Sequence, residues 1–249
     1  MQKRKVVLFL VLIILLLTVY LFRFPIFYRF QISRLRSLPC SKEACLSRVW
    51  AHRVNTIERR KYLSQFSGYE LDVIYTGPKG FAVLHPPDEV VGDTLRLETY
   101  LDEADMHNHR FWLDTRFVDS TNLGEALLAF NDLRRRYPDF DHCILEVYYL
   151  PVARLLAANG YNVSFNVSKR WLDNLPGNRS LQDSVREILK DVKYVSQEAV
   201  YLPVVKQLFP DKKILTWHLA INDFFNRKPL KALLADPQVE AILVNIKTP

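Results

Sequence analysis

Acidic residues are missing from the first 36 positions of this 249-residue chain, although the same positions hold seven Lys and Arg residues. The whole chain carries a net charge of +7, which taken alone would suggest a nucleic-acid binder. Removing the seven N-terminal bases from the total of 34 leaves 27 bases, which balance the 27 acids of the chain. Residues 37–249 are therefore neutral, and we exclude nucleic acid as the partner.

Cysteine is also scarce, with three residues in the chain. Cys40 and Cys45 are close enough in sequence for a small-loop disulfide in an oxidising compartment, and two free thiols are the equal alternative. A zinc site is disfavoured, because no second cysteine pair or nearby histidine pair completes it. Cys143 lies in an apolar run typical of a strand, and we expect it in the core.

One long apolar run, Val6–Phe22 (VVLFLVLIILLLTVYLF), follows the first basic residues. As a helix it would span about 25 Å, just short of the ~30 Å hydrocarbon core of a bilayer. No small-x-small cleavage site follows it, which favours an uncleaved signal anchor over a cleaved signal peptide. Lys and Arg lie on both sides, and we expect the N-terminus inside and the folded domain outside the cytoplasm. The sequence thus predicts a single-pass membrane protein with a transmembrane anchor over 1–28, a stem over 29–46 and a folded domain over 47–249.

Short apolar runs alternate with helical patterns after the stem. The expected strands are 48–54, 69–75, 110–116, 142–149, 161–167, 192–197, 213–219 and 241–246. The expected helices are 56–66, 94–104, 121–135, 151–158, 180–190, 199–209 and 227–235. Eight such units predict an α/β fold, a closed (β/α)8 TIM barrel. The run 81–86 follows the second strand after only five residues, too few for a helical crossover, and we expect a hairpin arm there.

Two carboxylates share one face of the second strand, in the stretch GYELDVIY. Glu70 and Asp72 are two positions apart and point the same way, whereas Leu71 and Val73 point to the helices. Buried carboxylates need compensation, and a hard cation such as Mg²⁺ or Ca²⁺ prefers oxygen ligands. Two acids on a solvated strand end are the structural alternative.

A third acid and two histidines favour the metal site. Asp114 lies in the third strand, near the carboxyl end where functional groups of such barrels gather. His52 ends the first strand and His85 ends the hairpin arm, so the two imidazoles could act as base and acid on a phosphodiester. The adjacent bases Arg53 and Arg116 could hold phosphate oxygens.

Four motifs in this order resemble the glycerophosphodiester phosphodiesterase superfamily: AHRVNT at 51–56, ELDV at 70–73, VLHPPD at 83–88 and WLDTR at 112–116. The resemblance covers nearly all of 48–249. The short turn after His-Arg resembles sphingomyelinase D-like enzymes, and WAHRVNT with HPPD is most similar to the menorin-type domain. The insertion that usually follows the second histidine is missing, which implies a more open site.

The resemblance implies that Glu70, Asp72 and Asp114 bind a divalent metal, Mg²⁺ or Ca²⁺, and that His52 and His85 are the acid–base pair. It also implies that Arg53 contacts phosphate, that Arg116 replaces a usual lysine, and that Trp217 lines the pocket.

We therefore expect a membrane-anchored, metal-dependent phosphodiesterase acting on glycerophosphodiesters or (lyso)phospholipids. A catalytically inactive binding or adhesion domain on the same barrel is the alternative, as is a barrel whose acids serve only structure.

Overall fold

The structure is a computed structural model that describes residues 47–85, 94–218 and 227–246, together with residues 12, 13, 29 and 33. The chain divides into two compact units, Met1–Pro39 with Ile246–Pro249, and Cys40–Asn245. Nearly all of the predicted anchor, and both Cys40 and Cys45, lie outside the described residues. Across the described positions we find no helix with the length and apolar composition that crossing a bilayer requires.

Eight parallel strands form a closed ring, because β1 pairs with both β9 and β2. Around the ring the order is β1, β9, β8, β7, β6, β5, β4 and β2, and β3 pairs antiparallel with β2 on the outside of this series. The strands are β1 (Val49–Ala51), β2 (Gly68–Tyr75), β3 (Phe81–Val83), β4 (Arg110–Arg116), β5 (Ile144–Val147), β6 (Asn162–Asn166), β7 (Tyr194–Glu198), β8 (Lys213–His218) and β9 (Val239–Val244). The predicted barrel and its hairpin arm are confirmed.

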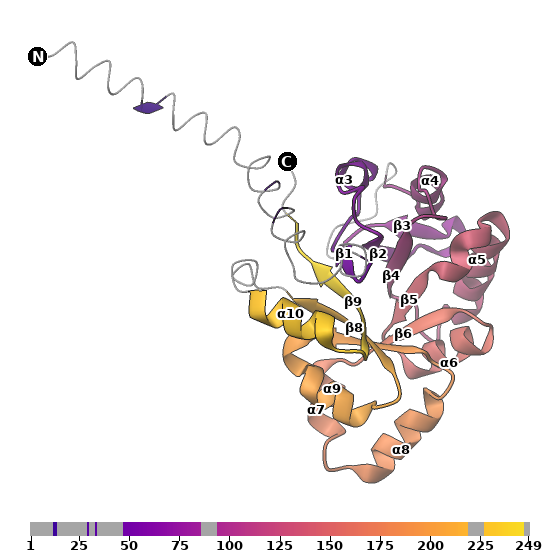
Figure 1. Cartoon of the computed structure of the whole chain (residues 1–249). Coiled ribbons are helices and arrows are strands. Elements are labelled where there is room, and N and C mark those ends of the chain that lie inside the picture. Colours follow the sequence, from indigo (N-terminus) through magenta and orange to yellow (C-terminus); the bar gives the residue numbers. More distant parts are fainter. Residues whose placement is uncertain are drawn as a thin grey trace, which may run out of the picture. The chain divides into compact units, whose positions relative to one another are not determined.

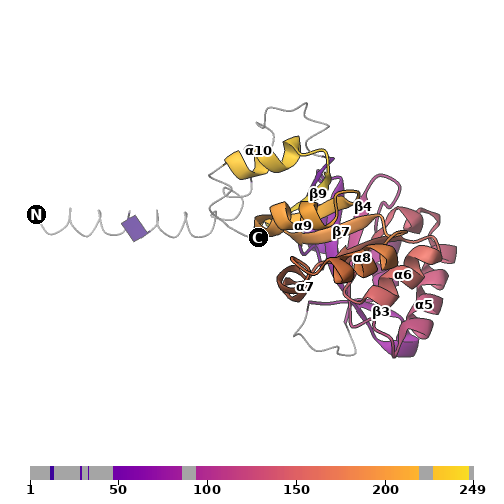
Figure 2. The same cartoon turned by 90° about the horizontal axis from the view of Figure 1, so that it is seen from below.

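Helices follow the strands and cover the outer face of the ring (Figure 1). They are α3 (Ile57–Tyr62), α4 (Leu97–Asp102), α5 (Leu123–Arg136), α6 (Leu150–Ala158), α7 (Lys169–Asn174), α8 (Arg179–Ile188), α9 (Leu202–Leu208) and α10 (Arg227–Ala235). Both views place α5, α6 and α8 outside the strands (Figure 2).

Two details differ from the sequence-based expectation. The stretch between β6 and β7 holds two helices, α7 and α8, where one was expected. Gly177 separates them with a φ of 83°, a conformation that ends a helix and that glycine adopts without strain. The first strand ends at Ala51, so that His52 and Arg53 lie in the loop after it, where Arg53 has a φ of 56°.

The barrel interior is filled mainly by large side chains that alternate with the outward-facing apolar residues. Trp50, Trp112, Tyr194 and Leu215 belong to one buried cluster inside the ring. Leu71 and Val73, which flank the acids on β2, are also fully buried, on the opposite face of that strand. Bulky rings therefore fill much of the interior.

Gly68 is required by the close packing of β2 on Trp50. A Cβ atom at this position would overlap the indole ring of Trp50, which is itself fully buried. We expect Gly68→Ala to lower the free energy of unfolding by about 1–3 kcal/mol, because the indole cannot move without disturbing the core. Gly124→Ala is the matched control, since a Cβ there meets nothing within 4 Å and the residue lies in α5. Chemical denaturation should show the control unchanged or stabilised, and equal stability of the two variants would contradict this account.

Candidate active site

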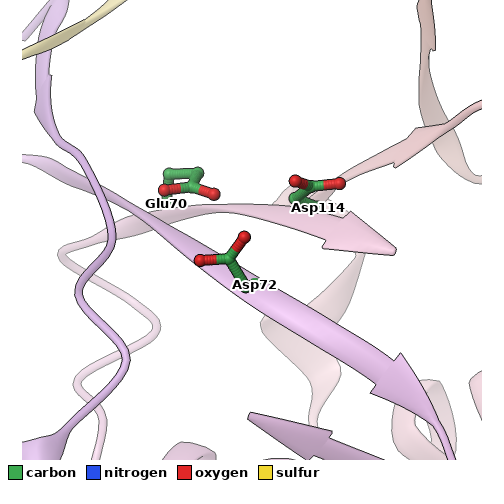
Figure 3. Close-up of side chains that lie close together, drawn as sticks. All are labelled: Glu70, Asp72 and Asp114. Atoms are coloured by element: carbon green, nitrogen blue, oxygen red, sulfur yellow. The ribbon is translucent and has the colours of Figure 1, made fainter. Parts of the chain in front are cut away.

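The three predicted acids meet inside the barrel, two on β2 and one toward the carboxyl end of β4 (Figure 3). Glu70 and Asp72 share the inner face of β2, and Asp72 is paired in register with Asp114 on β4. One carboxylate oxygen of each lies within 4.8 Å of the others, and all three residues are at least 96% buried. Asp114 therefore faces the interior with the other two acids and not the outer helices.

Glu70 is held by the loop that follows β1. The backbone N–H of Arg53 donates a 2.6 Å hydrogen bond to Oε2 of Glu70. A positive φ at a non-glycine residue is uncommon and costs conformational energy, and at Arg53 it accompanies this short contact. Nε2 of His52 lies 3.6 Å from the same carboxylate oxygen.

Asp72 is held by Asn55, a residue that the sequence-based hypothesis did not assign to the site. The Asn55 amide donates to Oδ2 of Asp72 at 2.8 Å and accepts from the backbone N–H of Asp72 at 3.0 Å. On the other side, Nε2 of His85 lies 3.9 Å from Oδ1 of Asp72. The two histidines thus flank different carboxylates, His52 beside Glu70 and His85 beside Asp72.

Asp114 is neutralised by Arg116, which comes from the same strand face. Nε of Arg116 donates to Oδ2 of Asp114 at 2.9 Å, and its Nη2 lies 3.4 Å from Oδ1 of Asp72. The hydroxyl of Tyr148, a second residue missed from the sequence, donates to Oδ1 of Asp114 at 2.7 Å.

The acids perturb one another because they are buried together. Burial, with the charges of Asp72 and Asp114, raises the pKa of Glu70 well above its ordinary value. Burial also raises the pKa of Asp114, against the opposing effect of the Arg116 guanidinium. One guanidinium does not balance three buried carboxylates. A further positive charge would therefore stabilise this part of the barrel.

A cavity of about 120 Å³ opens beside the acids. Of the other predicted site residues, His52, Arg53, Arg116 and Trp217 line it, whereas His85 is not among its lining residues. The ring of Trp217 packs edge-on against the buried ring of Trp112, with centroids 6.3 Å apart.

Glu146 forms part of the cavity and was not predicted. It lies on β5, in register with Asp114, and is 97% buried. Its carboxylate accepts hydrogen bonds from Trp112 Nε1 at 2.7 Å, Asn166 Nδ2 at 2.7 Å and Ser196 Oγ at 2.5 Å. Burial and the nearby charge of Asp114 raise the pKa of Glu146 to about 8. The sequence did contain a signal, since Glu146 interrupts the apolar run CILEVYY as Asp114 interrupts FWLDTR.

His52 has one ring nitrogen available to accept a proton. Its Nδ1 lies 2.7 Å from the amide oxygen of Asn245, so Nδ1–H donates there and Nε2 keeps its lone pair. Burial lowers the pKa of His52 to about 4, despite the opposing hydrogen bond to Asn245. At neutral pH the imidazole is therefore uncharged.

Glu70, Asp72 and Asp114 form the group of acids that could hold a metal ion. The donors are all oxygens, which suits a hard divalent cation such as Mg²⁺ or Ca²⁺ better than a soft one. Such an ion together with Arg116 would match the three negative charges.

Solved structures share this barrel. A glycerophosphodiester phosphodiesterase from Parabacteroides distasonis is 15% identical, with a TM-score of 0.60 over 80% of this chain and 93% of that one. A protein from Silicibacter pomeroyi, provisionally named a glycerophosphoryl diester phosphodiesterase, is 15% identical, with a TM-score of 0.62 over 88% and 94%. A phosphodiesterase from Oleispira antarctica, in complex with its product sn-glycerol-3-phosphate, is 10% identical, with a TM-score of 0.55 over 80% and 93%.

These structural neighbours carry the names of phosphoric diester hydrolases of the superfamily that the sequence motifs resemble. At such low identity the likeness shows the shared (β/α)8 fold, and the fold expected from the resemblance is confirmed. No protein-family model and no curated protein matches the chain.

Glu146 should make the metal-free protein less stable at alkaline pH. The unfolded chain loses this proton near its ordinary value of 4.5, whereas the folded protein keeps it up to about 8. The stabilisation is therefore complete below 4.5 and is lost as the pH rises toward 8. Chemical denaturation in chelator should show a loss on the order of 5 kcal/mol between the two ends of this range.

Glu146→Gln removes this titration and should reduce the pH dependence to the part that Glu70 and Asp114 contribute, even if the variant is less stable throughout. Asp132 is an exposed carboxylate on α5, and Asp132→Asn should keep the same pH dependence of stability as the parent protein. An unchanged pH profile in Glu146→Gln would contradict the proposed protonation of Glu146.

Proposed function

We propose that the chain is a membrane-anchored, divalent-metal-dependent phosphodiesterase that cleaves glycerophosphodiesters or (lyso)phospholipids by histidine acid–base catalysis. The observation that carries the proposal is the meeting of three buried carboxylates with two histidines at the carboxyl end of a barrel. The phosphodiesterase names of the structural neighbours support it.

Glu70, Asp72 and Asp114 would hold the divalent ion. When bound, the ion would supply positive charge that polarises a phosphate oxygen and stabilises the charge developing there. Two of these carboxylates are already oriented by hydrogen bonds. The backbone N–H of Arg53 donates to Glu70, and the side-chain amide of Asn55 donates to Asp72. This preorganisation spares the site a rearrangement when substrate arrives.

The two histidines transfer the protons. Nε2 of His52 takes the proton of the attacking hydroxyl, because the imidazole is neutral and its Nδ1–H is committed to Asn245. The hydroxyl oxygen forms a bond to phosphorus, and the bond from phosphorus to the leaving oxygen breaks. His85, on the opposite flank of the acids, returns a proton to that oxygen. If the attacking hydroxyl is water the product is a phosphomonoester, and if it belongs to the substrate the product is a cyclic phosphate.

Arg53 and Arg116 supply the charge that binds the phosphate. The Arg53 side chain is exposed and lines the cavity, so it is free to meet an incoming anion. Arg116 is already paired with Asp114, and this pairing raises the pKa of the guanidinium although partial burial opposes it. Arg116 therefore keeps its positive charge during the reaction. The indole ring of Trp217 provides an apolar surface for the rest of the substrate.

The substrate class follows from the proposed anchor. A helix over residues 6–22, with its stem over 29–46, would keep the domain over 47–249 beside a bilayer, outside the cytoplasm. This location favours a phosphodiester with a lipid part, and a small glycerophosphodiester is the soluble counterpart. In the same compartment Cys40 and Cys45 could form a disulfide.

An inactive binding domain on the same barrel is the second candidate, and one contact favours it. Nη2 of Arg116 reaches both Asp72 and Asp114, at 3.4 and 2.8 Å, so a cation already occupies part of the space between these acids. A barrel that used Arg116 in place of the metal would bind phosphates without cleaving them.

Activity separates the two candidates. Purified full-length protein should hydrolyse a glycerophosphodiester or a lysophospholipid with Mg²⁺ or Ca²⁺ and lose this turnover in chelator. His52→Ala should reduce kcat by about 10²- to 10⁴-fold, because the proton acceptor is gone. Asp114→Asn should abolish the metal-dependent part of the turnover, because it removes one of the three charged ligands.

Two matched variants control for folding and charge. His107→Ala alters a histidine whose side chain is 83% exposed, and Asp132→Asn alters a carboxylate that is 67% exposed. Both should keep parental activity. Absence of metal-dependent turnover on every substrate tested would refute the enzymatic proposal and leave the binding domain.

The anchor is tested by extraction from membranes. Full-length protein should stay with the membrane pellet in alkaline carbonate, because a helix over 6–22 would be held by its apolar surface. A chain lacking residues 1–28 should move to the supernatant. Release of the full-length protein by carbonate would show that this run does not anchor the chain.

A further inference from the structure

A second cavity lies at the opposite end of the barrel from the carboxylates. Its volume is about 670 Å³, within the range of small-molecule sites. Residues at or just before the first positions of several strands line it, including Arg48 before β1, Arg110 of β4 and Tyr194 of β7. This cavity shares no lining residue with the cavity beside Glu70 and Asp114, so the two cavities are separate.

Positive charge predominates in this cavity. The lining includes three permanent cations, Arg48, Arg110 and Lys193, and one acid, Glu240. Nη1 of Arg48 donates to the carbonyl oxygen of Leu234, and its Nη2 to other backbone carbonyls, so Arg48 contributes charge and not free donors. Only an acceptor-rich, negatively charged ligand matches such a surface.

Arg110 and Lys193 are better placed to bind a ligand. Nη1 of Arg110 lies 3.4 Å from Glu240, and its guanidinium lies 5.2 Å from the ring of Trp50. Nζ of Lys193 lies 4.8 Å from the ring of Tyr194, and the Lys193 residue is exposed. Trp50 and Tyr194 belong to the same buried cluster, so each cation lies over one aromatic ring of that cluster.

Tyr194 provides an independent indication of a ligand. The residue is fully buried and lines the cavity, yet among the described residues its hydroxyl has no hydrogen-bond partner. A buried hydroxyl without a partner costs on the order of 1–3 kcal/mol. A ligand oxygen in the cavity would accept this O–H and remove the cost.

The histidines of the cavity are engaged elsewhere. His107 and His142 lie 3.9 and 3.7 Å from carboxylate oxygens of Asp139. His109 contacts the backbone carbonyl of Asp105 at 3.0 Å. The acids near the cavity rim thus face imidazoles, and the part around Arg110, Lys193 and Tyr194 keeps its excess of positive charge.

We propose that this cavity is a binding site for a phosphate group, held by Arg110 and Lys193 with the Tyr194 hydroxyl donating to a phosphate oxygen. A guanidinium and an ammonium beside one hydroxyl donor match the charge and the several acceptors of a phosphate. The phosphate can belong to a soluble phosphomonoester or to an anionic lipid headgroup. The proposal is independent of catalysis at the other end of the barrel.

Inorganic phosphate is the first probe, in calorimetric titrations of the full-length protein in neutral detergent with chelator present. Arg53 and Arg116 at the other end of the barrel could also bind phosphate, so binding to this cavity is identified by the loss of affinity in variants of its own residues. Lys193→Gln and Tyr194→Phe should each weaken phosphate binding by about 5-fold or more, because each removes one donor. Lys190→Gln removes the same charge three positions away, where Lys190 pairs with Glu187, and should leave the affinity unchanged.

Thermal unfolding separates ligand binding from a structural role. Tyr194→Phe deletes a hydroxyl that has no partner, so its Tm should equal or exceed that of the parent while its phosphate affinity falls. No phosphate binding by the parent protein, or equal affinity in Lys193→Gln, Tyr194→Phe and Lys190→Gln, would overturn the proposal.

Two further binding experiments with the same variants distinguish the two sources of the phosphate. If nanodiscs with phosphatidic acid displace inorganic phosphate and nanodiscs of phosphatidylcholine do not, the site takes a lipid headgroup. If sn-glycerol-3-phosphate binds through Lys193 and Tyr194 and phosphatidic acid has no effect, it takes a soluble phosphomonoester.

Discussion

The burial of Glu70, Asp72 and Asp114 beside one another is the constraint on which the site depends. Adjacent parallel strands in register place Asp72 opposite Asp114, and the period of two along β2 adds Glu70 to the same face. Three charges in a closed interior are unfavourable alone, and the neighbouring polar contacts are arranged around them. Arg116 supplies one positive charge, and Asn55, Tyr148 and the Arg53 N–H supply donors. A divalent ion would complete the balance, which is why the proposed chemistry and the stability of this region are linked.

The strand register extends this polar row across the barrel. Asp72, Asp114, Glu146, Ser164 and Tyr194 are paired one with the next on β2, β4, β5, β6 and β7. The row begins near the carboxyl end of β2 and reaches the first residue of β7, because the strands of a closed barrel are staggered. One end of the row thus lies among the carboxylates and the other beside the basic cavity. The same geometry gives the barrel an acidic end, where we propose that a metal ion binds, and a basic end, where we propose that a phosphate binds.

The fold and the central acids were predictable because both depend on periodicity. Alternating runs predicted eight strands, and an acid inside an apolar strand predicted a carboxylate in the interior, as for Asp114. The same rule applied to CILEVYY would have found Glu146. Asn55, Tyr148 and Asn245 could not be found in this way, because their roles depend on loop conformations and on contacts such as that of His52 with Asn245, 193 positions away. Helix α7 was missed because its six residues, Lys169–Asn174, are too few to show a clear helical period.

The central claim is that Glu70, Asp72 and Asp114 together bind one divalent ion. Crystals of the protein soaked in Mn²⁺, an ion with the same preference for oxygen ligands, test it directly through anomalous diffraction. The account predicts a single strong anomalous peak between the three carboxylates, at bonding distance from an oxygen of each, and its disappearance in Asp114→Asn. Mn²⁺ bound elsewhere, or an Arg116 guanidinium that keeps its contacts with Asp72 and Asp114 and leaves no peak among the acids, would contradict the claim.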